Sequence, residues 1–331
     1  MNGGFMTIMI FQTEKSEATP RRRKGKRRAA ALMLKLALIS AILGIGAGRA
    51  FACACGCDVF GVGTPWTMPV KPGPSLFLQY SYMDQNRNWH GQGPASPDLN
   101  TDKNINTSFY TLGAQYMINR SWGIRAEIPF WDRYFRTSPG GVGSASVDEK
   151  SLADINLLGM YTGLSPDMST AIEFGLKLPT GTHTQALMDR DTQIGTGTTD
   201  LLLGGYHLWQ WEGWGMYAQG MYAYALDRMD GYRPGDRFNA AVGAHYDGLA
   251  PDYRIVPLAQ LESSFRGRDS GPSADPDNTG YQRLFISPGF EAQISQRMSV
   301  YADVEVPIYT HVNGYQLVAP LLVNTAIVYN F

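Results

Sequence analysis

Short segments in which apolar and polar residues alternate recur between about residue 75 and the C-terminal Phe331. In the first of them, Leu76, Leu78, Tyr80 and Tyr82 share one face. A period of two residues is that of a β-strand, and about ten residues are enough for a tilted strand to cross a membrane. The predicted strands lie near residues 75–84, 110–118, 122–130, 153–161, 172–178, 198–209, 214–226, 238–246, 255–265, 284–290, 300–308 and 317–331.

The connections between these segments alternate between short turns and longer loops that are rich in Asn, Asp, Gly and Pro. The short turns lie at 119–121, 165–167, 210–213, 248–252 and 295–297, and the loops at about 85–105, 135–149, 180–196, 227–236, 266–279 and 309–314. Short periplasmic turns and long outer loops are typical of transmembrane β-barrels. The sequence therefore predicts an all-β fold, an antiparallel transmembrane β-barrel of about 12 strands over residues 75–331.

The last strand supports the membrane alternative over a soluble β-sandwich or lipocalin-like barrel, which has the same period. Phe331 ends a segment with apolar or aromatic residues at alternate positions, and this pattern resembles the C-terminal signature of bacterial outer-membrane barrels. The resemblance implies insertion into the outer membrane of a Gram-negative bacterium. The expected partners are outer-membrane lipid and the barrel-assembly machinery. The lipid-facing residues are predicted to be Leu317, Ala319, Leu321, Val323, Thr325, Ile327, Tyr329 and Phe331.

The N-terminal region has the organisation of a secretory signal peptide. A basic run, Arg21–Arg28, precedes an apolar stretch, and Ala50-Phe51-Ala52 offers a cleavage site. We expect residues 1–52 to be removed, with Met33 as an alternative start. These residues contain ten of the 28 Lys and Arg residues and two of the 29 acidic residues, so the remaining chain has a formal charge of −9. An exported acidic chain is not expected to bind nucleic acid.

The strand faces opposite the apolar ones carry many charged residues. Because a charged side chain at the bilayer midplane costs about 2–4 kcal/mol, these faces are expected to line the lumen. Two interpretations remain open: a polar lining that selects solutes, and a hydrogen-bonded network that packs the barrel. The predicted lumen residues are Arg125, Glu127, Arg133, Asp154, Glu173, Lys177, Asp200, His245, Glu262, Arg283, Glu291, Asp303 and Glu305.

The three cysteines, Cys53, Cys55 and Cys57, lie close together at the start of the expected mature chain. They belong to a segment, residues 53–74, that we expect to be periplasmic or to enter the lumen. Thiolates are soft ligands, so a Cu or Zn site is one possibility, with lipidation of Cys53 and a structural role as the others. No cofactor is otherwise expected.

No catalytic residues are predicted, because a G-x-S-x-G motif is missing and no Ser–His pair is evident, and an enzyme is not expected.

Two motifs carry a family resemblance. Gly175-Leu-Lys-Leu-Pro-Thr-Gly181 and Gly195-Thr-Gly-Thr-Thr-Asp-Leu-Leu-Leu-Gly204 resemble the strand–loop–strand core of the outer-membrane β-barrel family named for a MetA pathway of phenol degradation. That family is transporter-like, and its name implies the uptake of aromatic compounds. The resemblance assigns no binding residue.

We therefore predict an outer-membrane channel that passes small polar, charged or aromatic solutes by passive diffusion. The alternative is a closed barrel that serves as a scaffold or as a metal-handling anchor through its cysteines.

Overall fold

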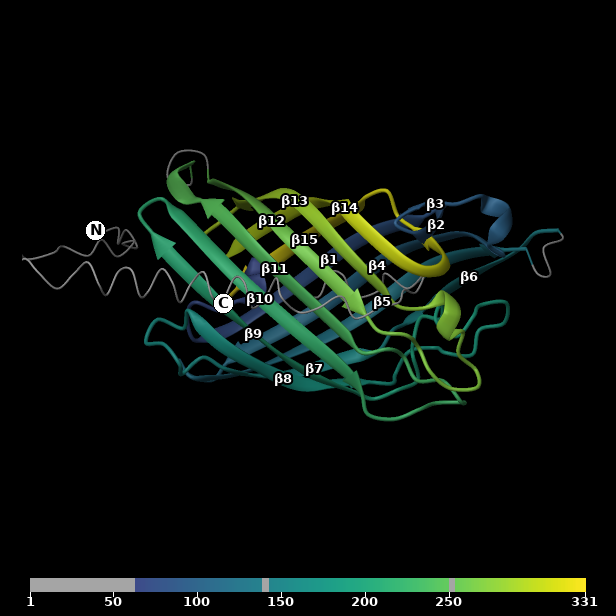
Figure 1. Ribbon diagram of the computed structural model, residues 1–331. Coiled ribbons are helices and arrows are strands. Elements are labelled where there is room, and N and C mark those ends of the chain that lie inside the picture. The colour runs from purple at the N-terminus through teal and green to yellow at the C-terminus, as the bar shows by residue number, and fades with distance from the viewer. Residues whose placement is uncertain (1–62, 139–142, 250–253) are drawn as a thin grey trace, which may run out of the picture. The chain divides into compact units, whose positions relative to one another are not determined.

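The computed structural model describes residues 63–138, 143–249 and 254–331, which form a closed antiparallel β-barrel with tilted strands (Figure 1). Neighbouring strands pair in the order β1-β4-β5-β7-β8-β9-β10-β11-β12-β13-β14-β15, and β15 pairs with β1 to close the wall. The strands are β1 (Gly73–Gln85), β2 (Arg87–Gly91), β3 (Gly93–Pro94), β4 (Asp102–Met117), β5 (Trp122–Thr137), β6 (Ala145–Leu152), β7 (Ile155–Tyr161), β8 (Thr170–Leu178), β9 (Asp200–Trp211), β10 (Trp214–Ala225), β11 (Arg237–Tyr246), β12 (Ile255–Arg266), β13 (Tyr281–Gln293), β14 (Met298–Val318) and β15 (Leu322–Asn330).

The predicted twelve-strand barrel is confirmed, because β6 and β7 share one place in the wall. β6 pairs with the second half of β5 and β7 with its first half. The break between them lies beside Pro129 of β5, whose ring nitrogen has no hydrogen to donate to a neighbouring strand. The backbone N–H of Ala153 donates to the Pro129 carbonyl at 2.9 Å, and the chain turns inward at Asp154.

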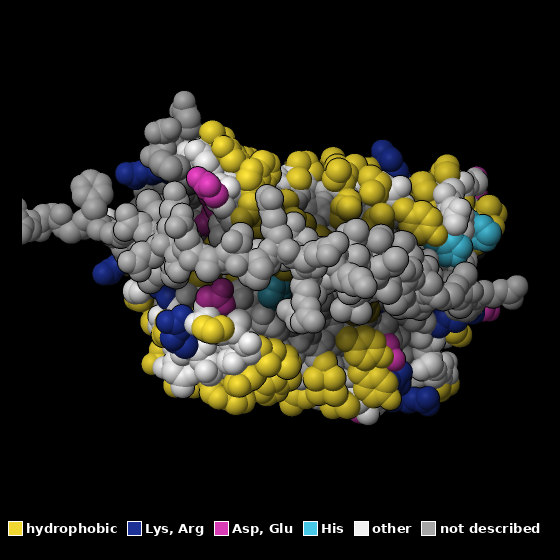
Figure 2. Space-filling model, turned by 60° about the vertical axis from the view of Figure 1, so that its left-hand side comes forward, with side chains coloured by type: hydrophobic (Ala, Val, Ile, Leu, Met, Phe, Trp, Pro, Cys, Tyr) yellow, Lys and Arg dark blue, Asp and Glu magenta, His cyan; other side chains and the backbone are white. Residues whose placement is uncertain are grey.

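Apolar side chains cover the outer wall, as the alternation predicts. Leu78, Leu112 and Ile124 lie on three neighbouring strands and are 50%, 53% and 56% exposed. Figure 2 shows the hydrophobic side chains over the wall, with charged side chains nearer the two ends. Such a wall suits hydrocarbon, where a closed barrel satisfies every backbone hydrogen bond between its strands. Among the described residues, no helix is long and apolar enough to cross a membrane.

Three of the predicted outer loops contain strand instead. β2 and β3 lie within 85–105, β5 and β6 extend into 135–149 from its two ends, and β14 runs without a break through 309–314. The alternation missed these parts because they project beyond the apolar belt. Their outward residues are therefore polar as well, as in β6, where Ser146, Asp148 and Lys150 are exposed.

The predicted start of the last strand is also wrong. Leu317 and Ala319 are buried, not lipid-facing, because β14 ends at Val318 and β15 begins at Leu322. Pro320 lies in the turn between them, where a missing N–H donor costs no ladder hydrogen bond. Because of this turn, the odd-numbered residues just before Pro320 face the lumen and those after it face the lipid side. From Leu321 onward the predicted faces hold, and Phe331 is 58% exposed.

The segment before β1 lies inside the barrel at the end that carries the short turns. A single 3₁₀ turn, η2 (Pro65–Thr67), places the Trp66 ring 4.2 Å from that of Tyr301 on β14. Met68 packs against Tyr206 and Tyr217 from β9 and β10. Because these partners lie on well-separated strands, the segment spans the lumen and narrows the barrel at the end that carries the short turns.

Candidate functional site in the barrel lumen

The loop between β8 and β9, residues 179–199, folds into the lumen from the end opposite the short turns, and Asp154 anchors it. Asp154 Oδ1 accepts a hydrogen bond from the Gly181 N–H at 3.0 Å, and Oδ2 accepts from the Thr196 N–H and hydroxyl, each at 2.9 Å. Asp154 can reach both ends of the loop because the β6–β7 break turns it inward. We call residues 179–199 the inward loop.

Glycines let the two ends of the inward loop pack backbone against backbone. A Cβ added at Gly195 would lie 2.4 Å from the Gly181 carbonyl, and one added at Gly181 would lie 2.7 Å from the Gly195 Cα. The Gly195 N–H donates to the Thr182 carbonyl at 2.7 Å. Both glycines belong to the motifs that carry the family resemblance, so these motifs encode the fold of the loop.

Two groups of buried ion pairs surround the lumen beside the loop. Lys177 Nζ lies 3.2 Å from Asp154 and 2.9 Å from Asp200. Nearer the end that carries the short turns, Arg125 lies 2.9 Å from Glu127 and 3.0 Å from Glu173. An Arg125 Nη1 hydrogen bond to the Thr67 carbonyl, 3.4 Å long, connects this group to η2. Six of the predicted lumen residues therefore pair with one another: Arg125, Glu127, Asp154, Glu173, Lys177 and Asp200.

Arg133 holds the tip of the inward loop. Its guanidinium donates to the carbonyls of Thr192 and Gln193 and to the Thr107 hydroxyl, and it lies 5.0 Å from the centre of the Trp131 ring. These contacts bury the side chain, although arginine is hydrophilic. Arg133 therefore fixes the position of the inward loop as well as lining the lumen.

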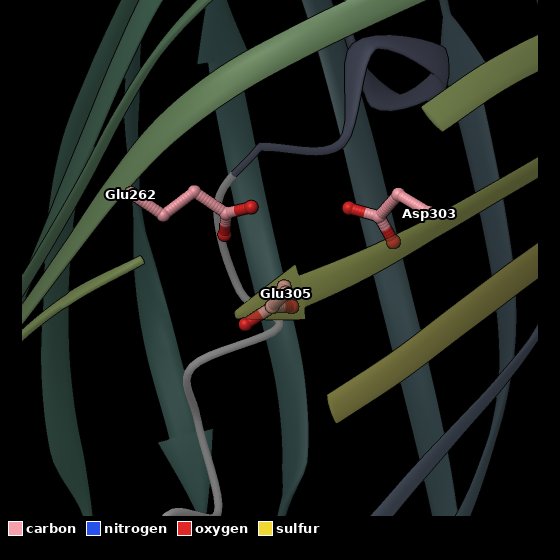
Figure 3. Close-up of side chains that lie close together, drawn as sticks. All are labelled: Glu262, Asp303 and Glu305. Atoms are coloured by element: carbon pink, nitrogen blue, oxygen red, sulfur yellow. The ribbon is translucent and has the colours of Figure 1, made fainter. Parts of the chain in front are cut away.

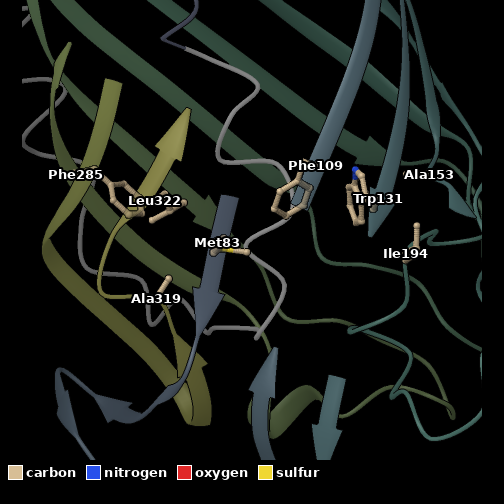
Figure 4. Close-up of a cluster of buried hydrophobic side chains, with 8 residues drawn as sticks. All are labelled: Met83, Phe109, Trp131, Ala153, Ile194, Phe285, Ala319 and Leu322. Atoms are coloured by element: carbon tan, nitrogen blue, oxygen red, sulfur yellow. The ribbon is translucent and has the colours of Figure 1, made fainter. Parts of the chain in front are cut away.

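A cavity of about 120 Å³ lies between the inward loop and η2. One part of its lining is apolar and includes Phe77, Phe109 and Trp131; the latter two rings meet edge to face at 4.9 Å. Another part is charged and includes Arg125 and Lys177. Phe109 and Trp131 belong to a buried cluster with Met83, Ala153, Ile194, Phe285, Ala319 and Leu322 (Figure 4). The first and last strands of the barrel, β1 and β15, contribute to this cluster through Met83 and Leu322, and the inward loop contributes Ile194.

A second, outer cavity of about 580 Å³ opens above the inward loop. Four acidic residues, Asp102, Asp189, Asp191 and Asp275, contribute to its lining. Arg190, Asp191 and Tyr232 line both cavities, so they form the neck between them. The Arg190 guanidinium lies 4.7 Å from the centre of the Tyr232 ring and donates to the His183 carbonyl.

The other predicted lumen residues lie on strands farther round the barrel or nearer the end that carries the short turns. Glu262, Asp303 and Glu305 are buried together on β12 and β14. Arg283 is buried with its guanidinium 4.3 Å from the centre of the Tyr281 ring. His245 and Glu291 are half-buried and line a cavity of about 310 Å³ at the end that carries the short turns, where His245 lies 3.5 Å from Asp247. The predicted residues thus form several separate groups.

Sequence reasoning missed several residues that shape the site. Phe77, Phe109 and Trp131 lie on the inward face of their strands, and their alternation with outward residues was a usable signal. Gln193 and Ile194 belong to a loop, for which a period of two gives no orientation. Cys53, Cys55 and Cys57, like the signal peptide of residues 1–52, lie outside the described residues, so a metal at the cysteines stays a prediction.

Comparison with known proteins gives the family and the fold. An outer-membrane channel from Pseudomonas putida F1 superposes with a TM-score of 0.61 at 13% identity, covering 80% of this chain and 96% of that one. The toluene transporter TbuX from Ralstonia pickettii gives a TM-score of 0.42 at 11% identity, with 86% and 96% covered. No curated protein sequence matches. Residues 60–315 match the family described as "Putative MetA-pathway of phenol degradation", and the chain therefore belongs to that family.

Proposed function

We propose that this protein is an outer-membrane channel through which a small aromatic solute with a polar or anionic substituent moves down its concentration gradient. The observation that carries the proposal is the central cavity, which places the Phe109 and Trp131 rings in the same lining as Arg125 and Lys177. Membership of a family described by phenol degradation supports an aromatic solute.

The size of the cavity fits one ring. Its volume of about 120 Å³ is close to the roughly 150 Å³ of an engineered apolar cavity that binds benzene. Edge-to-face contact with a ring such as Trp131 contributes about 0.5–1.5 kcal/mol beyond the area buried. The nearby guanidinium and ammonium groups can donate hydrogen bonds to a hydroxyl, carboxylate or sulfonate on the same solute.

Passage requires the inward loop and η2 to move, because they separate the cavity from the two ends of the barrel. Polar contacts hold both: Asp154 and Arg133 hold the loop, and Arg125 contacts the η2 carbonyl. Such contacts can exchange for contacts with water or solute without breaking the barrel wall. The channel is therefore a gated one, with the neck at Arg190 and Tyr232 as the outer entrance.

Flux into proteoliposomes tests the proposal. Benzenesulfonate and methanesulfonate are suitable probes, because a permanent charge keeps both from crossing the lipid unaided. We expect wild-type protein to pass benzenesulfonate faster, and Trp131→Ala to lower that flux about tenfold, in keeping with the loss of a ring contact worth about 1.4 kcal/mol. Trp209→Ala is the matched control, since Trp209 faces outward and is 45% exposed.

The opposite result is also specific. A barrel that passes neither probe, both as wild type and after replacement of residues 184–193 by a short Gly-Ser linker, would contradict the channel. It would favour the scaffold alternative. Equal flux of the two probes in wild type and in Trp131→Ala would contradict an aromatic solute while leaving the channel.

A further inference from the structure

A group of three carboxylates lies buried in the lumen wall, apart from the central cavity. Glu262 extends from β12, and Asp303 and Glu305 extend from successive inward positions of β14. Carboxylate oxygens of the three lie within 4.8 Å of one another, and the residues are only 2%, 3% and 1% exposed. Figure 3 shows the Glu262 and Asp303 side chains pointing toward one another, with Glu305 beside the gap between them. We call these residues the acidic triad.

The acidic triad differs from the acids beside the central cavity in having no cationic partner. Asp154 and Asp200 pair with Lys177, and Glu173 pairs with Arg125. Within the described part of the chain, no Lys, Arg or His side chain forms an ion pair with Glu262, Asp303 or Glu305. Buried charges are ordinarily paired or coordinate a metal, because removing them from water is costly.

Within the part of the chain that the structure describes, one buried carboxylate oxygen of each triad residue has no hydrogen-bond partner. Glu305, the most deeply buried of the three, has Oε2 without a partner, and the same holds for Glu262 Oε1 and Asp303 Oδ1. The other Asp303 oxygen is satisfied, since Oδ2 accepts from Gln260 Nε2 at 2.9 Å and from the Ser287 hydroxyl. Gln260 is fixed in turn by the Tyr217 hydroxyl. The surrounding groups therefore orient Asp303 and leave one of its oxygens available.

We propose that the acidic triad binds a hard divalent cation, with Ca²⁺ as the best fit. All the available donors are oxygens, which suit Ca²⁺ and Mg²⁺ better than the softer Cu or Zn. The triad offers up to five carboxylate oxygens, because Asp303 Oδ2 is already hydrogen-bonded, and water can complete the six to eight ligands that Ca²⁺ takes. Mg²⁺ demands nearer to ideal octahedral geometry and retains more of its water.

A cation here would join parts of the protein that are distant in sequence. β13 lies between β12 and β14 and contributes Ser287, so the site connects three strands of the wall. The chain before η2 also reaches it: a Cβ placed on Gly63 would lie 3.0 Å from the Glu262 carboxyl carbon. The cation would therefore stabilise the wall where the segment before β1 contacts it.

Calcium binding to the purified full chain tests this inference. The protein is refolded in detergent without lipopolysaccharide, which itself binds divalent cations, and titrated with Ca²⁺, Mg²⁺ and K⁺ by calorimetry. We expect one Ca²⁺ per chain, weaker Mg²⁺ binding and no K⁺ binding. Glu305→Gln and Glu262→Gln should each weaken Ca²⁺ binding at least tenfold. Glu212→Gln, in an exposed turn, is the matched control and should bind as wild type does.

Folding and binding are separated by a second measurement. Heat-modifiable migration on gels reports the folded barrel, and Ca²⁺ should raise the temperature of its loss in wild type and Glu212→Gln only. The proposal is overturned if folded wild type binds no Ca²⁺ at about 10 mM, ten times the weak end of the range for extracellular sites. It is also overturned if the Glu305 and Glu262 variants bind like wild type. Neither outcome bears on the channel, which rests on the central cavity.

Discussion

Asp154 Oδ2 accepts hydrogen bonds from both the backbone N–H and the hydroxyl of Thr196, each at 2.9 Å. One carboxylate in a break of the barrel wall thereby fixes the end of a loop that fills the lumen. The same carboxylate group lies 3.2 Å from Lys177 Nζ. Asp154 therefore connects the barrel wall, the inward loop and the Lys177 ion pairs. A substitution at Asp154 should change how far the inward loop blocks the lumen.

Replacing Asp154 by alanine should release the inward loop. The loss leaves the Gly181 and Thr196 N–H groups without their acceptor, and a broken buried pair costs about 3–5 kcal/mol. We expect larger and noisier single-channel conductance in planar bilayers than for wild type. Asp132→Ala is the control, because Asp132 forms an exposed pair with Lys150. Unchanged conductance of folded Asp154→Ala would show that this anchor does not control the opening.

Gly195→Ala should displace the loop by a different route. The new methyl group would meet the Gly181 backbone at 2.4 Å, and a backbone neighbour cannot rotate away. We expect faster cleavage of the loop by added protease, in a barrel whose heat-modifiable migration persists. Gly93→Ala is the matched control, since a Cβ there meets no atom within 4 Å. Equal cleavage of the two variants would argue against close packing of the two glycines.

The wall of the barrel was predictable because lipid imposes a simple rule on it. Alternation located all twelve strands, since each outward residue between the two interfaces must be apolar. Outside that belt the rule fails. The outward residues of β6 are polar, and its strand was therefore mistaken for a loop. Similarly, the apolar spacing alone places the start of the last strand at Leu317, whereas the turn at Pro320 delays it to Leu322.

For the lumen, the sequence predicts which side chains point inward but not which of them contact one another. Period two identifies Arg125, Glu173 and Lys177 as inward residues, and the structure shows which acids accompany each base. The pairing depends on the order of the strands and on their shear. These place Arg125 beside Glu173, although the two residues lie about 50 positions apart in the sequence. The inward path of residues 179–199 is set by Asp154 and Arg133, and no periodic pattern encodes it.

Arg125→Met should destabilise the barrel through the carboxylate it leaves behind. Glu173 is nearly fully buried and would lose its cation, at a cost of about 3–5 kcal/mol. We expect a lower urea midpoint for unfolding in detergent micelles, and recovery of part of the loss when Glu173→Gln is added. Lys150→Met removes the base of an exposed pair and should cost less than about 1 kcal/mol. A double variant no more stable than Arg125→Met would mean that the unpaired Glu173 carboxylate is not the cause of the destabilisation.

The turn after β11 should give a small pH-dependent contribution to stability. The pKa of the Asp247 carboxyl is lowered by the His245 side chain, which is 3.5 Å away, and by Gln210 Nε2, which is 2.5 Å away. A lowered pKa in the folded state means that the ionised group stabilises the fold above its unfolded pKa, about 3.9. That contribution is lost as the pH falls through the folded pKa. Because the group is partly exposed, it is below about 1 kcal/mol.

Thermal unfolding of Asp247→Asn measures this contribution. At pH 6 the variant should unfold at a slightly lower temperature than wild type. The difference should shrink below pH 4 and vanish once Asp247 is protonated in the folded protein. Glu212→Gln, in the exposed β9–β10 turn, should show no such dependence. A difference between Asp247→Asn and wild type that stays constant from pH 6 to pH 2 would mean that packing, not charge, makes the contact between His245 and Asp247 favourable.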